Sequence, residues 1–420
     1  MPTKISPTLC AQCKGSRRLC GRVKCPILIR LETQLELDEK LKRNVVFGAT
    51  PPEVLIGESG YPEVRAGPLI PPVLDDEIAT TYGNPENWYG KSIEEIIRIR
   101  SSVVRASFKV RVKEASRLSS RLLNLTQELA MSIKPVDTEA HFYKPPTPRM
   151  AFDGVLSPIG PSASLRKLIL AENPSVPRKV EQAVYDYDAR ASEVVGELYD
   201  RGYSNYYLTQ LLTAGLLGQR RERRIVPTRW GITAVDSIIG DHILEKVRDY
   251  QEIGEILLYT NSYLDNNYYI LLMPGAYAFE MIEIWLPKTI WVRRLKPYIV
   301  ENFELYDGKW RRGEINGGYK AMRLAVLEYL NKIRRQAMVL AIREIGPEYY
   351  CPVGVWQVRE GMRNAFKNKP IKVDSIDDAI KIVSSKLRTE FQLWIKYAKL
   401  IQLFCLLYTS DAADDGESVV

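Results

Sequence analysis

The spacing of hydrophobic residues predicts several helices in the second half of the chain. Over residues 178–201, apolar side chains recur at intervals of three or four, which places them on one face of a helix. Residues 204–217 repeat this spacing after Gly202, so the two segments are predicted to form a helical hairpin. Long amphipathic helices are also expected over residues 320–345 and 376–403. The C-terminal third is therefore predicted to be mostly helical.

Strand patterns are concentrated in two other regions. Between residues 255 and 306, short apolar runs are separated by turn sequences, a pattern typical of an antiparallel sheet. Residues 107–113 alternate as a strand and lead into a helix with regularly spaced leucines. A further strand is expected over residues 352–359.

One more helix is expected after a proline-rich segment, where Ser162 or Ser164 would cap its start.

Length and composition narrow the class of protein. The chain has 420 residues and is 45% hydrophobic, whereas a single core typically holds about 100–200 residues, so two or three packed units are expected. We find no apolar run of membrane-spanning length and no secretory signal, so we expect a cytoplasmic protein without a membrane partner. The two histidines exclude HExxH metalloproteases and multi-histidine metal centres.

The last sixteen residues differ from the rest of the chain. Residues 405–420 resemble the translation of a sequencing-library adapter, so we expect them to be a scar and exclude them from the fold. Without their four acidic side chains, the net charge rises from +8 to +12. The expected native part is therefore strongly basic.

Four of the six cysteines lie within the first 25 residues. Cys10, Cys13, Cys20 and Cys25 have spacings that suit tetrahedral coordination, and cytosolic thiols stay reduced. One structural zinc ion at these four thiolates is the prediction. An iron–sulfur cluster is the rival, favoured by Pro26 but with unusual spacing, and four unliganded cysteines are the simplest alternative.

Three segments carry a large excess of cations. Residues 1–30 have seven basic residues and no acid, residues 98–121 have eight basic residues and one acid, and residues 218–224 have four arginines. Such segments favour contact with phosphate groups, although charge on a zinc module can equally be solvated surface. The predicted nucleic-acid-binding residues are Arg17, Arg18, Arg22, Lys24, Arg220, Arg221, Arg223 and Arg224.

A loop rich in glycine and proline, residues 57–68, suggests an alternative function. Glycines permit close approach of a ligand to the backbone, although a turn-dense connection between strands explains the same residues. In an enzyme acting on DNA or a nucleotide, this loop would form a pocket with a second segment, in which arginines hold phosphate and a carboxylate acts as base. The side chains considered for that pocket are Glu58, Arg65, Thr228, Arg229 and Asp236.

Other interpretations are weaker. Arg229 and Trp230 would place a guanidinium beside an aromatic ring, as in proteins that stack bases, but ordinary cores use such pairs equally. Glu280 and Glu283 are unlike a magnesium site, because their spacing on a strand directs them to opposite faces. The third class of function considered is an assembly scaffold whose zinc module and helices bind protein.

Five blocks in order resemble one known family. They are Cys10-x2-Cys13-x-Gly15, residues 47–68 with Gly60-Tyr61-Pro62, and residues 157–163, 226–236 and 352–360. Over residues 8–404 the chain is similar to the archaeal Nre DNA-repair family. The resemblance implies an archaeal DNA-repair factor that engages the sliding clamp PCNA through a short C-terminal motif. Here no intact Gln-x-x-aliphatic-x-x-aromatic-aromatic motif follows Gln402, so we expect PCNA binding to be lost.

These inferences together predict an α+β protein that binds DNA. Its expected parts are a four-cysteine zinc module with a linker helix over 1–44, an Nre-like N-terminal domain over 45–224, an Nre-like C-terminal domain over 225–404 and the scar. A mixed α/β body would surround a central antiparallel sheet. The sequence leaves open whether the protein is also an enzyme.

Overall fold

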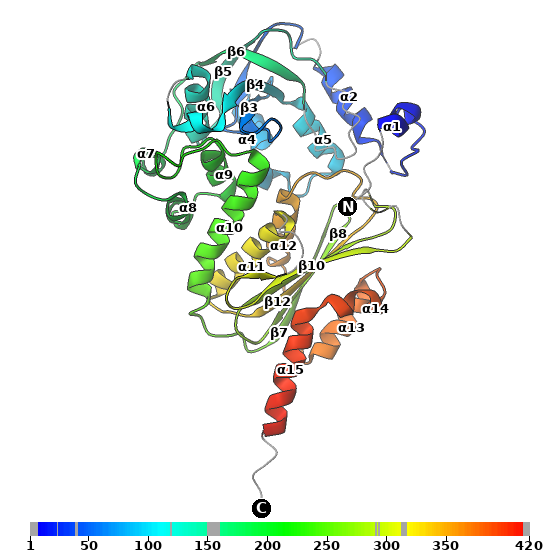
Figure 1. Ribbon diagram of the computed structural model, residues 1–420. Helices are drawn as coiled ribbons and strands as arrows, with labels where there is room; N and C mark the ends of the chain where they lie inside the picture. Colours follow the sequence, from blue (N-terminus) through cyan, green and yellow to red (C-terminus); the bar gives the residue numbers. More distant parts are fainter. Residues whose placement is uncertain are drawn as a thin grey trace, which may run out of the picture.

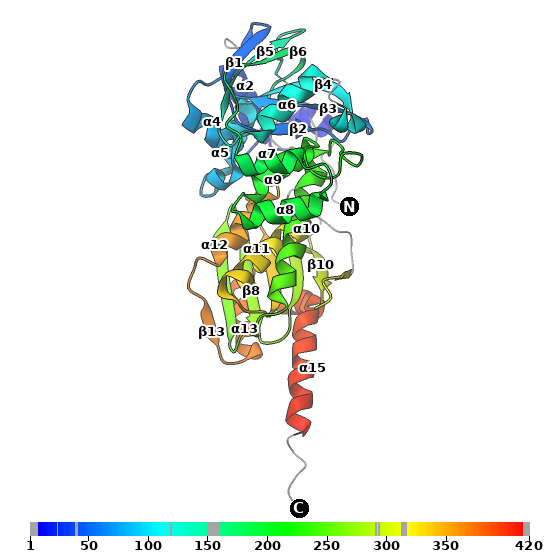
Figure 2. The same cartoon turned by 90° about the vertical axis from the view of Figure 1, so that its left-hand side faces the viewer.

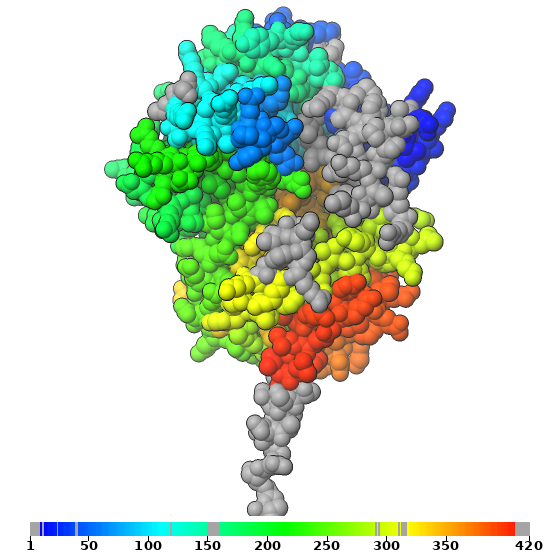
Figure 3. All heavy atoms as spheres, viewed as in Figure 1, coloured from blue at the N-terminus to red at the C-terminus, as the bar shows by residue number. Residues whose placement is uncertain are grey.

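The computed structural model contains two β-sheets with a layer of helices between them (Figure 1). It describes residues 7–414 apart from 23, 38–40, 118–119, 149–159, 290–291, 293–294 and 312–316. The two sheets and their helices make one continuous body in the space-filling view (Figure 3). Among the described helices, none has the length and apolar character needed to cross a bilayer. This architecture confirms the predicted α+β class.

The N-terminal sheet has six strands in the order β1-β5-β6-β4-β3-β2. Their bounds are β1 Val45–Thr50, β2 Val54–Ile56, β3 Glu63–Ile70, β4 Val104–Arg111, β5 Val136–Phe142 and β6 Ser162–Leu170. Neighbouring strands are antiparallel except β4 and β6, which pair in parallel. On β4 the buried Ala106 and Phe108 alternate with Arg105 and Lys109, so one face of the sheet enters the core and the other carries charge.

Helices flank this sheet, and the N-terminal segment packs against one of them. They are α1 Pro7–Cys13, α2 Pro26–Glu36, α4 Asp76–Gly83, α5 Ile93–Ser102 and α6 Arg121–Met131, with 3-10 turns η1 Pro85–Trp88 and η2 Val112–Ser116. The predicted strand followed by a helix is confirmed by β4 and α6. The predicted helix cap at Ser162 or Ser164 is wrong. Both serines lie in β6, where the buried Ala163 and Leu165 alternate with them.

The middle layer consists of α7 Arg178–Tyr185, α8 Ala191–Asp200, α9 Asn205–Thr213 and α10 Thr228–Val247. The predicted hairpin is therefore three helices rather than two. The first predicted helix breaks after Tyr185, because the Asp186 carboxylate accepts the backbone amides of Asp188 and Ala189 and so stabilises a turn.

The C-terminal sheet has seven strands in the order β11-β10-β9-β12-β8-β7-β13. Their bounds are β7 Ile256–Tyr263, β8 Asn266–Met273, β9 Ala278–Trp285, β10 Tyr298–Glu304, β11 Trp310–Arg311, β12 Met338–Ile345 and β13 Ile371–Val373. The prediction of an antiparallel sheet is wrong, because β9 and β12 pair in parallel. Between them the chain passes through α11 Gly317–Ile333, which is the kind of crossover that a parallel pair requires.

Two further elements differ from the sequence prediction. The helix expected over 320–345 ends at Ile333, and the chain continues as β12, whose eight residues are all buried. A strand buried on both faces is an apolar run, so its periodicity cannot be distinguished from that of a buried helix. Where a strand is expected over 352–359, residues 352–355 are irregular and the chain then enters α12 Trp356–Ala365.

The C-terminal helices cover one face of the second sheet, and α10 to α12 cover the other (Figures 1 and 2). They are α13 Ile376–Lys386, α14 Phe391–Trp394, the 3-10 turn η3 Ile395–Tyr397 and α15 Lys399–Asp414. A third cluster joins Ile29 of α2, Ile96 and Ile97 of α5, and the Tyr350 and Trp356 region. This cluster attaches the cysteine-rich segment to both halves of the protein.

Candidate nucleic-acid interface

The outward face of the N-terminal sheet gathers exposed cations from three neighbouring strands. Arg65 of β3 lies directly opposite Lys109 of β4, and Glu63 lies opposite Arg111. Directly opposite residues share a face of the sheet, so these side chains project together. Glu63 pairs with Lys109 at 3.4 Å, which leaves the exposed Arg65 and Arg111 to dominate this surface.

Strand β6 extends the same face. Ser164 pairs with Ser107 of β4, and the exposed Arg166 and Lys167 follow on β6. Lys167 lies opposite His141 of β5, where an irregularity in the ladder turns both basic residues outward. The basic sheet face, as we name it, comprises Arg65, Lys109, Arg111, Arg166 and Lys167.

The four arginines of residues 218–224 have different environments. The guanidinium groups of Arg220 and Arg223 lie 5.1 Å and 4.9 Å from the ring centroid of Tyr187. Arg223 is buried and donates to the carbonyl oxygens of Gly218 at 2.7 Å and Asp186 at 3.0 Å. Burial lowers the pKa of Arg223. Arg223 therefore supports the loop, whereas Arg220 and Arg221 are exposed to a partner.

Arg224 also stabilises the loop. Arg224 is half-buried, and its Nη1 donates to the carbonyl oxygens of Arg221 at 3.0 Å and Arg223 at 3.1 Å. Its other terminal nitrogen lies 3.8 Å from Glu222. Of the four predicted DNA contacts in this segment, two are thus placed mainly for structure.

The cysteine-rich segment surrounds Cys13 with amide donors. Cys13 ends α1 and Cys25 immediately precedes α2, and the four thiols are reduced. The Leu19 amide donates to Cys13 Sγ at 3.4 Å and, with the Gly15 amide and others nearby, lowers the pKa of this thiol. Burial raises the pKa of Cys10, and the neighbouring Cys20 thiol raises it further. Among the residues that the structure describes, however, no three His, Cys, Asp or Glu side chains are close enough together to hold a metal ion.

The cations predicted in this segment are similarly divided. Arg17 and Arg18 are exposed. Lys24 is exposed but pairs with Glu94 of α5, and Arg22 is buried. Of these four predicted cations, Arg17 and Arg18 therefore present charge to solvent without a described ion pair.

The loop over residues 57–68 does meet the start of α10. The Thr228 hydroxyl accepts the Ile56 amide at 2.9 Å, which fixes the first residue of α10 to the edge of β2. Beyond this contact, Arg229 lies 3.6 Å from Glu58. The rings of Tyr61 and Trp230 lie 5.3 Å apart between centroids. Glu58, Thr228 and Arg229, which the sequence suggested as members of one pocket, therefore lie close together in the structure.

Asp236 lies away from that surface. It is 1% exposed and forms an ion pair with Arg359 of α12, whose guanidinium lies 5.0 Å from the ring centroid of Tyr206. A carboxylate enclosed in this way has no access to a substrate at the loop. Arg65 is also separate in role, because its Nη1 reaches Ser107 at 3.5 Å on the basic sheet face.

The two glutamates of β9 point to opposite faces, as predicted. Glu280 accepts the amides of Lys399 and Leu400 at 2.8 Å each. Glu283 accepts a hydrogen bond from Arg343 at 2.6 Å on the other side of the sheet. Each glutamate therefore has a structural partner.

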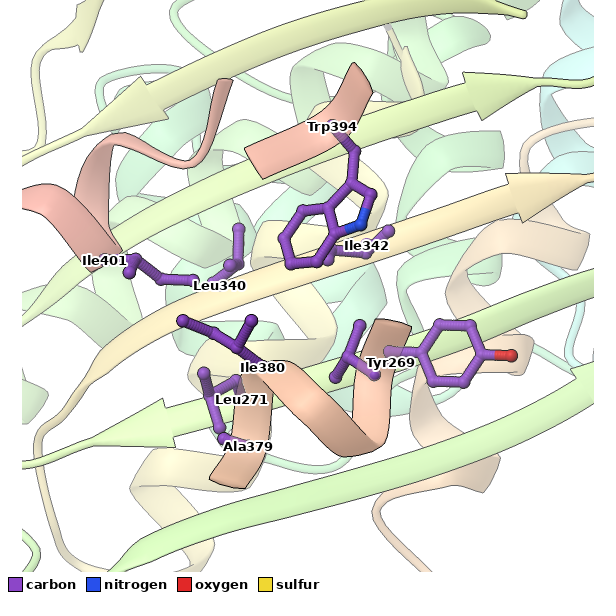
Figure 4. A pocket seen from close by; sticks show the side chains of 9 residues that line it. Tyr269, Leu271, Leu340, Ile342, Ala379, Ile380, Trp394 and Ile401 are labelled. Atoms are coloured by element: carbon purple, nitrogen blue, oxygen red, sulfur yellow. The ribbon is translucent and has the colours of Figure 1, made fainter. Parts of the chain in front are cut away.

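A small pocket lies between the second sheet and the C-terminal helices (Figure 4). It is lined by Tyr269, Leu271, Leu340, Ile342, Ala379, Ile380, Val383, Trp394 and Ile401. None of these lining residues is charged, and the hydroxyl of Tyr269 donates to the Lys386 carbonyl at 3.1 Å. It is a gap in apolar packing.

Two features of this candidate interface could not be predicted from the sequence. The segment 98–121 was recognised as basic, but the sequence could not show that Lys109 and Arg111 share a face with Arg65 of another strand. The alternation of basic and buried residues on β4 was the available signal. The contact of Tyr61 with Trp230 had no local signal, because it joins distant segments.

Comparison with known proteins defines the class to which the chain belongs. The family model described as archaeal Nre, N-terminal, matches residues 19–292, and the archaeal Nre, C-terminal, model matches residues 304–409. The chain therefore belongs to the archaeal Nre family, which confirms the resemblance drawn from the sequence. The solved structures gave no significant match.

Curated relatives match over most of their length. The protein named DNA repair protein NreA from Archaeoglobus fulgidus is 41% identical, over 91% of this chain and 94% of the relative. DNA repair protein NreB from the same organism is 35% identical, over 94% and 97%. DNA repair protein NreA from Haloferax volcanii is 34% identical, over 88% and 90%.

Proposed function

We propose that this protein is an archaeal DNA-repair factor that binds DNA through phosphate contacts on the basic sheet face. The repair role is supported by similarity to relatives that are named DNA repair proteins. The binding role is supported by the net charge of +8 and by its uneven distribution.

The observation that carries the proposal is the arrangement of Arg65, Lys109 and Arg111 on paired strands. Strand pairing holds Arg65 opposite Lys109, and successive residues on one face are about 7 Å apart along a strand. The backbone that presents these charges is therefore rigid. Phosphate contacts of this kind supply affinity without sequence preference, because they do not reach base edges.

Charge reversal tests the proposal directly. The double variant Arg65→Glu with Arg111→Glu should weaken binding to labelled duplexes of unrelated sequence alike, measured by anisotropy. Its matched control is Lys381→Glu with Lys396→Glu, which changes net charge equally on exposed residues of the C-terminal helices. If both double variants weaken binding equally, the loss of affinity comes from net charge alone, and this face is rejected as the interface.

We also propose that the four N-terminal cysteines hold one structural zinc ion. Support comes from the four free thiols within one short segment, from the electrostatic influence of the other three thiols on Cys10, and from the Leu19 amide that donates to Cys13. Bound zinc would require the four sulfurs to converge further than they do here. Its role would be to fix the segment that carries Arg17 and Arg18.

For the clamp, we propose that this chain binds PCNA weakly or not at all. Phe404 is 6% exposed and lies on the face of α15 that packs against the second sheet, so it is not available as an aromatic anchor. The next described side chains, Cys405, Leu406 and Leu407, are exposed but supply no aromatic ring.

A further inference from the structure

We propose that Tyr61 and Trp230 form a stacking platform for unpaired DNA bases. The inference rests on the proposed DNA-binding function and extends it to the DNA structure that is recognised. Single-stranded DNA, or a duplex with extruded bases, would be the preferred ligand.

The two rings are close together and accessible. Their centroids lie 5.3 Å apart at an interplanar angle of 48°, and Tyr61 and Trp230 are 52% and 47% exposed. Each residue therefore leaves about half of its surface in water, which is unfavourable for rings of this size unless a partner covers them.

The platform is preformed by hydrogen bonds in both of its segments. The Tyr61 amide donates to the Glu58 carbonyl at 3.3 Å, and the Glu63 amide donates to the Gly60 carbonyl at 2.9 Å, which closes the turn between β2 and β3. Gly60 has φ +87, and an added Cβ would lie 2.7 Å from the Glu63 carbonyl oxygen, so the turn requires glycine.

The other half of the platform is equally constrained. Trp230 is the third residue of α10, and its amide donates to the Pro227 carbonyl at 2.9 Å. Thr228 joins this helix start to β2, since its hydroxyl accepts the Ile56 amide and donates to the Val54 carbonyl at 3.4 Å. Holding the rings before binding lowers the entropy that a ligand must overcome.

Positive charge adjoins the rings on both segments. Arg229 precedes Trp230, and its side chain is 84% exposed, so its pairing with Glu58 at 3.6 Å is weak. Arg65 follows the turn on β3 and begins the basic sheet face. Proteins that bind single strands combine such aromatic surfaces with cations that follow the backbone.

A paired base inside a duplex cannot present its face to these rings, whereas an unpaired base can. Trp230→Ala should therefore weaken binding to oligothymidylate about tenfold and change the affinity for blunt duplex less than about twofold. Trp230→Phe keeps a ring and should retain most of the affinity. Phe391→Ala, which removes another exposed ring on α14, should have no effect.

The experiment is anisotropy with oligothymidylate and with duplex, on all variants, with thermal melting to confirm folding. A matching loss in Tyr61→Ala would support a two-ring platform. If Trp230→Ala binds oligothymidylate like the parent, or weakens both ligands equally, the platform is rejected while the phosphate-binding function stands. If the parent binds neither ligand, both proposals fail together.

Discussion

Asp236 of α10 and Arg359 of α12 form an ion pair in which each residue is only 1% exposed. The pair joins α10 of the middle layer to α12, which covers one face of the second sheet. Such a pair contributes to holding these helices in register, since removal of either partner leaves an uncompensated buried charge.

We predict that Asp236→Ala lowers the free energy of unfolding by about 3–5 kcal/mol. Denaturant unfolding measures this loss. Asp200→Ala provides the matched control, because the side chains of Asp200 and Lys246 are 45% and 40% exposed, and its contacts with Lys246 and His242 should together be worth about 1 kcal/mol. The double change Asp236→Leu with Arg359→Met should recover stability. Unchanged stability in Asp236→Ala would contradict a structural role and return this carboxylate to consideration as a catalytic base.

The arginines of residues 218–224 should fall into two groups, one that contributes to DNA binding and one that stabilises the loop. Arg220→Glu with Arg221→Glu should weaken DNA binding with little change in melting temperature, because both residues are exposed and the contact of Arg220 with Tyr187 is worth only about 0.5–1 kcal/mol. Arg223→Glu should lower the melting temperature by several degrees, since it breaks two buried hydrogen bonds and the contact with Tyr187. Melting curves that show the same loss for both variants would contradict this division.

Glu280 should make stability depend on pH. Burial raises the pKa of this carboxyl to about 8, although the amides of Lys399 and Leu400 oppose the shift. The folded state therefore holds a proton that the unfolded state releases near pH 4.5, and stability should fall by on the order of a few kcal/mol as pH rises from 4.5 to 8. Unfolding at a series of pH values should show a flatter profile for Glu280→Gln, whereas Glu245→Gln, at an exposed position, should follow the parent. An identical slope in Glu280→Gln would contradict the assignment.

Zinc should be present at one ion per chain and should depend on the N-terminal cysteines. Elemental analysis of Cys10→Ser and Cys20→Ser should show loss of the metal, while Cys405→Ser should retain it. Metal loss should loosen α1 and the turn after it, and the remaining sheets should stay folded. Iron with a visible absorbance band, or no metal in the parent, would reject the zinc proposal.

The proposal that this chain binds PCNA weakly or not at all can be tested by comparing it with a variant that carries an intact motif. Calorimetry with PCNA should detect little or no binding by this chain, because Phe404 is buried against the second sheet. A variant with Gln-x-x-Leu-x-x-Phe-Phe placed after Leu400 should bind, since it supplies aliphatic and aromatic anchors. Tight binding by the present chain would show that the contact lies elsewhere.

The sequence predicted the fold where periodicity is distinctive and failed where a segment is buried on both sides. Strand β4 exposes one face, so its alternating pattern is clear. The helix expected over residues 376–403 begins at Ile376 but ends at Lys386, and the chain continues as the separate helices α14 and α15. Strand β12 exposes neither face and was mistaken for helix. The parallel pairing of β9 with β12 depends on a crossover that no local pattern records.

In the candidate site too, the features that depend on one segment were predictable, and those that depend on contacts between distant segments were not. Charge excess identified the basic segments, but the separation of Arg220 from the buried Arg223 required the position of Tyr187. Asp236 was selected because it followed Thr228 and Arg229 in sequence. Helix α10 carries it into the core, where its partner Arg359 comes from a helix far along the chain.

The central claim is that phosphate contacts on the basic sheet face bind DNA, and the salt dependence of affinity tests it most directly. For a duplex, the logarithm of affinity should fall linearly with the logarithm of salt concentration, by about 0.9 unit for each phosphate neutralised. The variant Arg65→Ala with Arg111→Ala should reduce that slope by about two units relative to the parent. An affinity that does not change with salt, or a slope that is the same in both proteins, would contradict the claim.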